Sequence, residues 1–196
     1  MIIGITGSIG SGKTTVAKLF SRQWYNVVDA DEIAHEILKK DKKVQKKAIK
    51  SFGKEILDEN KGINREKLSN IVFSDNKKLK KLNSITHPVI INEIKNQIKK
   101  ITKKCGGKAK IVIDAPLLLE TEAKNLVDEI IVVKCDKEKI LERNKEYPKG
   151  KIEKILNAQM PLNEKIGYAD FVIDNNKDLG HLENQVERIV DELRNR

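Results

Sequence analysis

The sequence has few of the features that mark secreted, membrane or zinc-bound proteins. It contains only two cysteines, Cys105 and Cys135, which lie far apart and lack the paired spacing of a zinc site or a disulfide framework. No apolar run approaches the roughly 20 residues that a membrane span needs. The chain opens on MIIGIT without a basic leader. We therefore expect a cytoplasmic protein with reduced cysteines and no membrane partner.

Aromatic residues are also scarce, at 4% of the chain, and most basic residues are lysine. Lys and Arg outnumber Asp and Glu by 39 to 29, which favours a polyanionic ligand such as a nucleotide, or a nucleic acid. The basic residues are spread through helical stretches of mixed sign, with few aromatics between them to stack on bases. This distribution favours a solvated surface, and we expect no nucleic-acid partner.

At 196 residues, the chain is long enough for one α/β core and a small inserted unit. Apolar runs at residues 2–6, 25–29, 110–114, 129–134 and 170–174 each precede a turn or helical pattern, which predicts a five-stranded parallel sheet. Residues 32–108 show helical patterns alone, with Asn64 and Ser74 as candidate N-caps and Pro88 in the first turn of another helix. We expect a core of residues 1–31 and 109–196 and an inserted helical substrate domain at residues 32–108.

One helical segment follows the fourth predicted strand, and a final helix follows the fifth. Residues 136–160 are polar and strongly charged, and are interrupted by Pro148 and Gly150. We expect this segment to bury little surface and to act as a lid. The final helix carries apolar residues at helical spacing, so one of its faces should pack on the sheet. These residues are Leu179, Leu182, Val186, Ile189, Val190 and Leu193.

The motif that carries the chemistry is GSIGSGKT, from Gly7 to Thr14, a full match to the phosphate-loop pattern between a strand and a helix. Its glycines let successive N–H groups face a phosphate chain at the helix N-terminus. Lys13 should reach the β and γ phosphates, and the Thr14 hydroxyl should coordinate Mg²⁺. The motif predicts a three-layer P-loop NTPase fold that binds ATP or GTP. The predicted nucleotide-binding residues are Gly7, Ser8, Ile9, Gly10, Ser11, Gly12, Lys13, Thr14 and Thr15.

Acidic residues follow two other predicted strands. Asp114 ends the apolar run IVID and is expected to hold Mg²⁺ directly or through water; an acid that caps the next turn is the alternative. Asp29 and Asp31 should lie at the carboxyl edge of the sheet, where ligands of open α/β folds bind. Phosphoryl transfer to an alcohol needs an acceptor for the hydroxyl proton, and we predict Asp31 as that base. The alternative is an N-cap for a helix that starts at Glu32.

Arginine is rare enough here that Arg65 and Arg143 attract interest, because a guanidinium can contact phosphate with two donors. We predict Arg143 over the transferring phosphate and Arg65 against the acceptor substrate, with surface ion pairing as the alternative for each. His87 directly precedes Pro88, where an ordinary turn role competes with a substrate contact. The histidines form no metal spacing.

In order and spacing, the segments GSIGSGKT, DADEIAHEIL, NREKLSNIVF, ITHPVI, APLLLE, NAQMP and YADFVIDNN resemble the dephospho-CoA kinase family along essentially the whole chain. The resemblance implies a nucleoside-monophosphate-kinase-like fold that transfers the γ phosphate of ATP to the ribose 3′-hydroxyl of dephospho-CoA, giving coenzyme A. It implies Asp31 as the base, and Arg65 and His87 on the acceptor side. It also implies Leu117, Leu118 and Glu120 near the acceptor, and Asn175 near the adenine.

One departure from the family pattern concerns the lid. Members commonly show a second arginine shortly after the one that matches Arg143, whereas this segment reads RNKEYPKGK. Lys145, Lys149 or Lys151 could supply the charge, without the planar fork of arginine.

Three other functions compete with this one. A nucleoside or nucleotide kinase is the nearest, because the phosphate loop does not identify the acceptor. A GTPase is disfavoured, because NNKD at 175–178 does not match NKxD and no DxxG follows Asp114. A nucleic-acid-binding ATPase is supported only by the basic charge. We expect an ATP- and Mg²⁺-dependent kinase that is a monomer or a weak homo-oligomer.

Overall fold

The computed structural model describes residues 1–147 and 150–195, so Pro148 and Lys149 lie outside the described residues. The chain forms two compact units, one of Met1–Asp29 with Asn96–Arg196 and one of Ala30–Lys95. These bounds differ from the predicted ones at residues 31 and 108. The second unit ends at Lys95 and not at residue 108, and Lys95 lies inside helix α5 (Asn76–Lys104). The chain therefore leaves the inserted unit within a helix.

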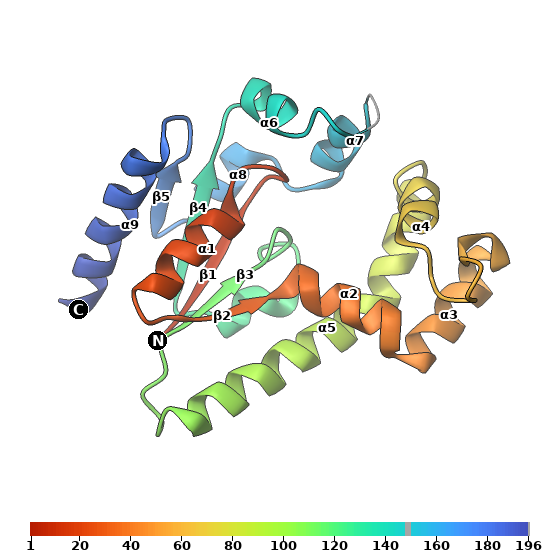
Figure 1. The fold of residues 1–196 in the computed structure, drawn as a ribbon, viewed down its shortest axis with the longest axis horizontal. Coiled ribbons are helices and arrows are strands. Elements are labelled where there is room, and N and C mark those ends of the chain that lie inside the picture. Colours follow the sequence, from red (N-terminus) through yellow and green to blue (C-terminus); the bar gives the residue numbers. More distant parts are fainter. Residues whose placement is uncertain (148–149, 196) are drawn as a thin grey trace. The chain divides into compact units, whose positions relative to one another are not determined.

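The first unit is built on a five-stranded sheet in the order β2-β3-β1-β4-β5 (Figure 1). The bounds are β1 Ile2–Gly7, β2 Asn26–Asp29, β3 Ile111–Asp114, β4 Glu129–Lys134 and β5 Phe171–Asp174. Every pairing is parallel. Ile3 and Ile5 of the central strand are fully buried, as expected for a strand covered on both faces. The predicted α/β sheet is confirmed, with ends within one residue of those expected.

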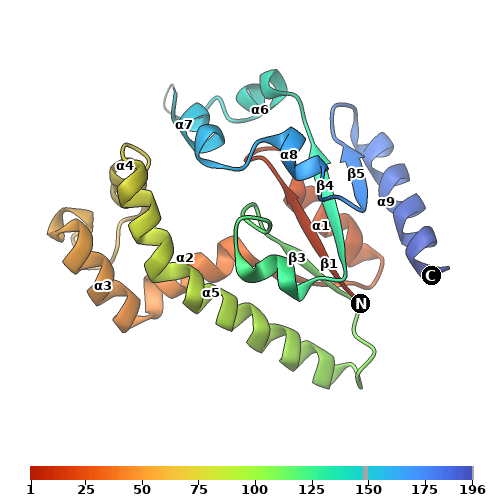
Figure 2. The ribbon, with the colours of Figure 1, turned by 180° about the vertical axis from the view of Figure 1, so that it is seen from behind.

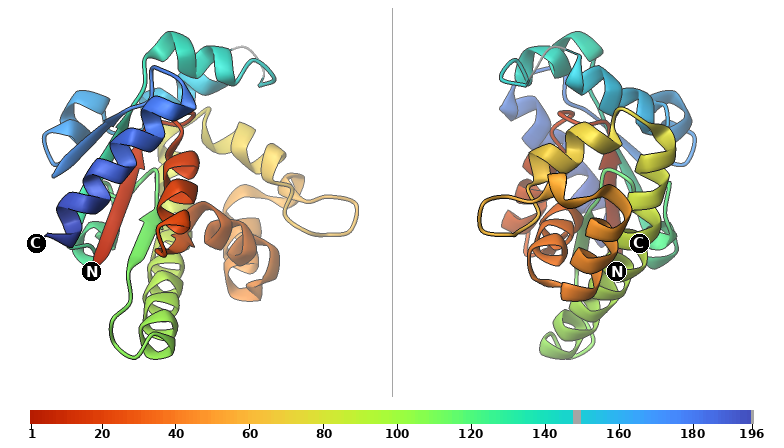
Figure 3. Two further views of the ribbon diagram at one scale, coloured as in Figure 1. Left: turned by 60° about the vertical axis from the view of Figure 1, so that its left-hand side comes forward. Right: turned by 90° about the vertical axis from the view of Figure 1, so that its right-hand side faces the viewer.

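Helices α1 (Lys13–Arg22) and α9 (Leu179–Arg194) lie side by side over one face of this sheet (Figure 3, left). The short helix α8 (Leu162–Ile166) contacts β1 and β4 from the opposite face (Figure 2). Helices α6 (Lys137–Arg143) and α7 (Lys151–Ala158) lie beyond the carboxyl end of β4. A 3-10 turn, Glu122–Leu126, precedes β4. The unit therefore has the three layers that the phosphate-loop motif predicts.

The apolar face of α9 packs as its helical spacing predicts. Leu182, Val186 and Val190 are almost completely buried, in one cluster with Phe20 of α1. Leu179 is the exception, because it is the first residue of the helix and is 53% exposed. At the end of α1, the rings of Phe20 and Tyr25 meet edge to face with centroids 5.2 Å apart.

The second unit is helical. It contains α2 (Ala30–Lys40), α3 (Lys42–Phe52), a 3-10 turn (Lys54–Ile56), α4 (Arg65–Val72) and α5 as far as Lys95. Asn64 caps α4 as predicted, because its side-chain oxygen accepts a hydrogen bond from the Lys67 amide at 3.0 Å.

Two sequence expectations in this unit are wrong. Ser74 is not an N-cap: its hydroxyl donates to the Ile71 carbonyl, and Asp75 accepts the Lys77 amide at 2.7 Å at the start of α5. Pro88 lies inside α5 and not in a first turn. A proline in a helix interior removes one backbone hydrogen bond, but the long apolar pattern on both sides keeps α5 continuous.

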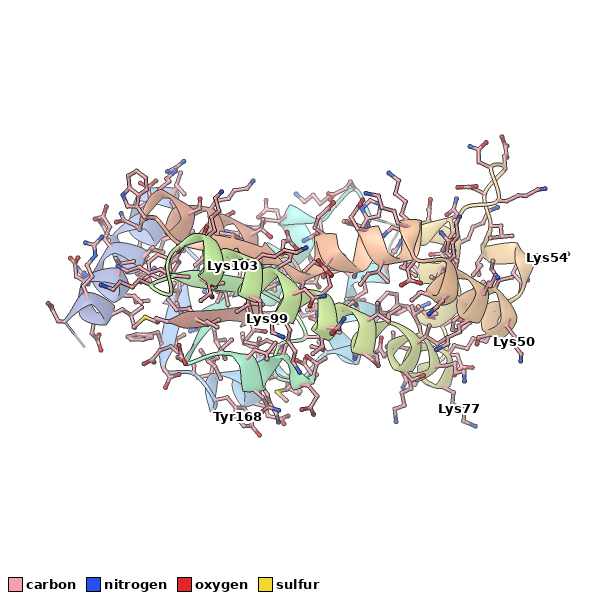
Figure 4. All side chains as sticks on the ribbon, turned by 90° about the horizontal axis from the view of Figure 1, so that it is seen from below. Lys50, Lys54, Lys77, Lys99, Lys103 and Tyr168 are labelled. Atoms are coloured by element: carbon pink, nitrogen blue, oxygen red, sulfur yellow. The ribbon has the colours of Figure 1, made fainter. Side chains whose placement is uncertain are left out.

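Lysine side chains extend into solvent from several elements. Figure 4 shows Lys99 and Lys103 on the last turns of α5, and Lys50 and Lys54 on and just after α3. Among the residues that the structure describes, no helix is long and apolar enough to cross a membrane.

Candidate functional site

The phosphate loop joins β1 to α1 at the carboxyl edge of the sheet. Gly10 and Gly12 have φ angles of +70° and +94°, in the left-handed region that glycine favours. Both glycines also lack room for a side chain. A Cβ at Gly12 would stand 2.1 Å from Asn175 Nδ2, and a Cβ at Gly10 would stand 2.3 Å from Asn144 Nδ2. The glycine spacing of the motif is therefore required both by the turn and by two amide side chains that lie against it.

Lys13 is the first residue of α1, and only 7% of its surface is exposed. Its Nζ donates to the Ser8 carbonyl at 3.0 Å, so the side chain folds back along the loop. Within residues 1–147 and 150–195, the amides of Gly10 and Gly12 donate to no acceptor. Loop amides and a lysine at a helix N-terminus form the arrangement that binds a polyphosphate.

Thr14, the second residue of α1, contacts Asp114 at the carboxyl end of β3. The Thr14 hydroxyl donates to Asp114 Oδ2 at 2.9 Å. β3, which ends in Asp114, pairs with β1, and Asp114 itself is only 4% exposed. A hydroxyl and a carboxylate are the hard oxygen ligands that suit Mg²⁺. In the part of the chain that the structure describes, no group of three or more His, Cys, Asp or Glu could hold a metal. The Thr14 hydroxyl and the Asp114 carboxylate could therefore offer two oxygen ligands to Mg²⁺.

Asp29 is the last residue of β2, and its register partner in β3 is Asp114. Asp31 follows two residues later as the exposed second residue of α2, in the other unit. Helix α2 starts at Ala30, so Asp31 is not the N-cap of a helix that begins at Glu32, and that alternative interpretation is wrong. Arg65 is the exposed first residue of α4, and His87 is half-buried in the middle of α5.

Arg143 ends α6 beside the phosphate loop. Its Nη2 donates to the Asn175 carbonyl at 3.0 Å, and its Nη1 donates to Cys135 Sγ at 3.4 Å. Asn175, which is buried just after β5, donates from Nδ2 to the Ser11 carbonyl at 2.7 Å. Burial raises the pKa of the Cys135 thiol, and the nearby Arg143 only partly opposes this shift. Cys135 is therefore a neutral packing residue, and the structure brings Arg143 and Asn175 together at the loop.

The α6–α7 segment buries little of its surface, as expected: Ile140 and Ile152 are its buried side chains among the described residues. These two form a small apolar cluster with Cys135, against which Ile9 and Leu156 pack. The segment's few apolar residues thus gather on the side that faces Ile9. Among the lysines considered for the missing arginine, Lys145 pairs with Glu142 at 3.5 Å and Lys151 lies over the Tyr147 ring. Lys149 lies outside the described residues.

The loop after β3 holds the residues expected near the acceptor. Leu118 is fully buried, whereas Leu117 is half-buried. Glu120 Oε1 accepts hydrogen bonds from the Met160 amide at 3.0 Å and from Lys165 Nζ at 2.9 Å. The carboxylate of Glu120 is thus already engaged within the first unit.

Sequence reasoning missed two residues of this region. Lys165 of α8 is fully buried, and its Nζ donates to the Pro116 carbonyl at 2.6 Å. Gln159 accepts the Ile9 amide of the phosphate loop at 3.1 Å. The signal for Lys165 was its place between Leu162 and Ile166, on the apolar side of a short helix. Gln159 lies in the NAQMP segment of the family resemblance, but its partner is 150 residues away, so no local pattern predicts this contact.

Together, the fold and the site define a P-loop kinase. A parallel sheet, a GSIGSGKT loop that opens α1, and an acid at the end of the adjacent strand are the parts of that class. The family model described as dephospho-CoA kinase matches residues 1–181. The chain belongs to the dephospho-CoA kinase family.

Individual relatives agree with this. A dephospho-CoA kinase from Fusobacterium nucleatum is 43% identical over 197 residues, covering 98% of each chain. The crystal structure of TT1252 from Thermus thermophilus has a TM-score of 0.78 at 28% identity, covering 98% of this chain and 97% of its own. The dephospho-CoA kinase from Campylobacter jejuni has a TM-score of 0.69 at 26% identity, covering 98% of this chain and 96% of its own. The predicted family, fold class and enzyme class are confirmed.

Proposed function

We propose that this chain transfers the γ phosphate of ATP to the ribose 3′-hydroxyl of dephospho-CoA, giving coenzyme A and ADP, the last step of coenzyme A biosynthesis. The observation that carries the proposal is the Thr14–Asp114 hydrogen bond beside the phosphate loop, in a chain of the dephospho-CoA kinase family. A kinase of this family takes ATP as its phosphoryl donor. We further propose that it acts in the cytoplasm on a small molecule, as a monomer or a weak homo-oligomer.

Each residue of the loop has a proposed task. The amides of Gly10 and Gly12 and the N-terminus of α1 bind the phosphate chain, and Lys13 neutralises charge on the β and γ phosphates. Arg143 lies beside Gly12, where its guanidinium can stabilise charge that develops on the transferring group. Asn175 lies against the Ser11 carbonyl and shapes the nucleotide side of the loop.

Mg²⁺ is proposed as the cofactor, with Thr14 and Asp114 as the residues that would hold it. When bound, the ion neutralises phosphate charge and orients the γ phosphate for attack. The chain contributes hard oxygen donors that are already in contact, so little rearrangement of these two side chains is needed.

Asp31 is proposed as the base that takes the proton from the 3′-hydroxyl. Chain position supports this role, because Asp31 follows the carboxyl end of β2, the strand whose last residue is in register with Asp114. Arg65 and His87 are proposed as acceptor-binding residues, and Leu117 and Leu118 are proposed to contact the acceptor as well.

The test is ADP release by the purified chain with ATP and Mg²⁺, comparing dephospho-CoA with AMP, CMP, dTMP and adenosine. Lys13→Ala and Asp31→Asn are expected to lower kcat on dephospho-CoA by a factor on the order of 10² to 10⁴. Asp41→Asn is the matched control, because Asp41 caps α3 and asparagine caps equally well. Its kcat should stay at the wild-type value.

Turnover confined to dephospho-CoA, with coenzyme A as the product, would support the proposal. If dephospho-CoA is inert while a nucleotide or nucleoside reacts, the proposed acceptor is wrong and the chain is a different kinase of the same fold. If ATP turnover occurs only with RNA or DNA present and falls steeply with salt, the nucleic-acid-binding ATPase becomes the better description.

A further inference from the structure

A closed set of hydrogen bonds connects the two sides of the phosphate site. On one side, the Thr6 hydroxyl of β1 donates to the Pro116 carbonyl at 3.2 Å, and Lys165 Nζ donates to the same carbonyl at 2.6 Å. Lys165 also pairs with Glu120 at 2.9 Å. These contacts fix the loop that directly follows Asp114.

On the other side, Glu120 Oε1 accepts the Met160 amide at 3.0 Å, and the preceding residue, Gln159, accepts the Ile9 amide at 3.1 Å. The path therefore returns to the phosphate loop three residues after Thr6. Residues 159 and 160 form the bridge between the loop after β3 and the loop after β1.

Ile9 is held twice by the same segment. Its amide donates to Gln159 just beyond α7, and its side chain packs against the cluster that contains Ile152 of α7 and Ile140 of α6. The position of Ile9 in the phosphate loop therefore depends on the positions of both α6 and α7. The Ile9 amide is thus engaged by Gln159, and phosphate binding falls to the amides of Gly10 and Gly12 and to the N-terminus of α1.

The base of this arrangement is rigid. Lys165 has no exposed side-chain surface, and its partner Glu120 is 20% exposed. A buried cation needs all of its partners, because an uncompensated buried charge is strongly destabilising. The ammonium group therefore fixes Pro116 and Glu120 in one geometry, and with them the bridge at residue 160.

We propose that Gln159 is a positioning residue for the nucleotide. Its side chain holds the phosphate loop through the Ile9 amide, and the Glu120–Lys165 pair holds Gln159 in place through Met160. Glu120 then acts on the phosphate loop through Lys165 and Met160. The inference rests on the proposed nucleotide-binding role of the loop, and it does not depend on the identity of the acceptor.

The test uses the full chain and measures ADP affinity by calorimetry in the presence of Mg²⁺, together with Tm. Gln159→Met removes the acceptor for the Ile9 amide at nearly constant length. We expect ADP to bind about tenfold more weakly, the order expected for one lost hydrogen bond at an ordered loop. Gln45→Met is the matched control, because Gln45 donates to the Leu38 and Lys39 carbonyls in the helical unit. It should lower Tm comparably and leave ADP affinity unchanged.

A double-mutant comparison tests the route through Lys165. Lys165→Met should also weaken ADP binding, and the double variant with Gln159→Met should bind ADP no more weakly than Gln159→Met alone, because both changes release the same loop. If Gln159→Met binds ADP like the wild type, the positioning role is overturned. If the two effects on affinity add fully, the route through Glu120 and Lys165 is overturned. ADP affinities that follow the expected pattern support the inference even where dephospho-CoA is not phosphorylated, a result that would overturn only the proposed function.

Discussion

The guanidinium of Arg143 donates a hydrogen bond from Nη2 to the backbone carbonyl of Asn175 at 3.0 Å. This contact joins the end of α6 to the end of β5, and the Asn175 side chain continues it to the Ser11 carbonyl of the phosphate loop. Helix α6 and the phosphate loop are therefore connected through Arg143 and Asn175. The guanidinium carries several N–H donors in one plane, so it can keep its hydrogen bond to the Asn175 carbonyl while other N–H groups face a phosphate.

Arg143→Lys is expected to lower kcat by a factor on the order of 10², because an ammonium group cannot hold the Asn175 carbonyl and also reach the transferring phosphate. Steady-state kinetics with varied ATP measures this. Arg22→Lys is the control, since Arg22 forms a surface ion pair with Glu183 at 3.2 Å. Wild-type kcat in Arg143→Lys would show that charge alone suffices at this position.

Asp114→Asn should keep the Thr14 contact, because an amide oxygen also accepts a hydrogen bond, but it removes the negative charge that attracts Mg²⁺. We expect kcat to fall by a factor on the order of 10² and the Mg²⁺ concentration for half-maximal rate to rise. Magnesium titrations of the rate measure both. Asp128→Asn, at the opposite end of β1 where Asp128 accepts the Ile2 amide, should leave the titration unchanged. An unaltered magnesium curve for Asp114→Asn would leave Asp114 as a structural acid.

Trp24 has a φ angle of +67° and is 87% exposed. It follows α1 in a Schellman-type end, where the Tyr25 amide donates to the Phe20 carbonyl and the Trp24 amide donates to the Ser21 carbonyl. A side chain in the left-handed region costs about 1–2 kcal/mol, and this one buries little in return. Trp24→Gly should therefore raise the free energy of unfolding by about 1 kcal/mol, as measured by urea denaturation.

Trp24→Ala is the matched control, because alanine keeps a Cβ in the same left-handed conformation. It should give no such gain in stability. Equal stabilities for the glycine and alanine variants would contradict an origin in backbone strain.

Burial raises the pKa of Tyr25 above its ordinary value of 10.0, and Arg194 opposes this shift only in part. A group whose pKa is higher in the folded state favours folding fully below its unfolded pKa. That contribution disappears as pH rises through the folded value. Tyr25→Phe lacks the ionisable hydroxyl, so the stability of wild type relative to this variant should fall above pH 10.

Urea denaturation of Tyr25→Phe and wild type at pH 8 and at several values above 10 measures this difference. The ring contact with Phe20 does not involve a charge, so it should persist in the variant. Parallel stability curves across this range would contradict the prediction.

Local patterns predicted the nucleotide half of the site, and tertiary context decided the rest. The strand before Gly7 and the spacing of the glycines are local patterns of a few residues, so the sequence predicts the phosphate loop. Asp114 is predicted in the same way, because it ends the apolar run IVID. Pro88 was misassigned because the helix on both sides of it outweighs one lost hydrogen bond. The partners of Gln159 and Lys165 lie 150 and 49 residues away, so no local pattern could connect them. The roles of Asp31, Arg65 and His87 stay predictions.

The sheet register has a consequence for how such a chain can diversify. Strands β2 and β3 are hydrogen-bonded neighbours, with Asn26 opposite Ile111 and Asp29 opposite Asp114. Residues 30–110 therefore form an insertion between two adjacent strands, and the pairing of these strands does not depend on the length of the insertion. Evolution can lengthen, shorten or exchange residues 30–110 without altering the pairing of β2 with β3, and so without moving Asp29 away from Asp114.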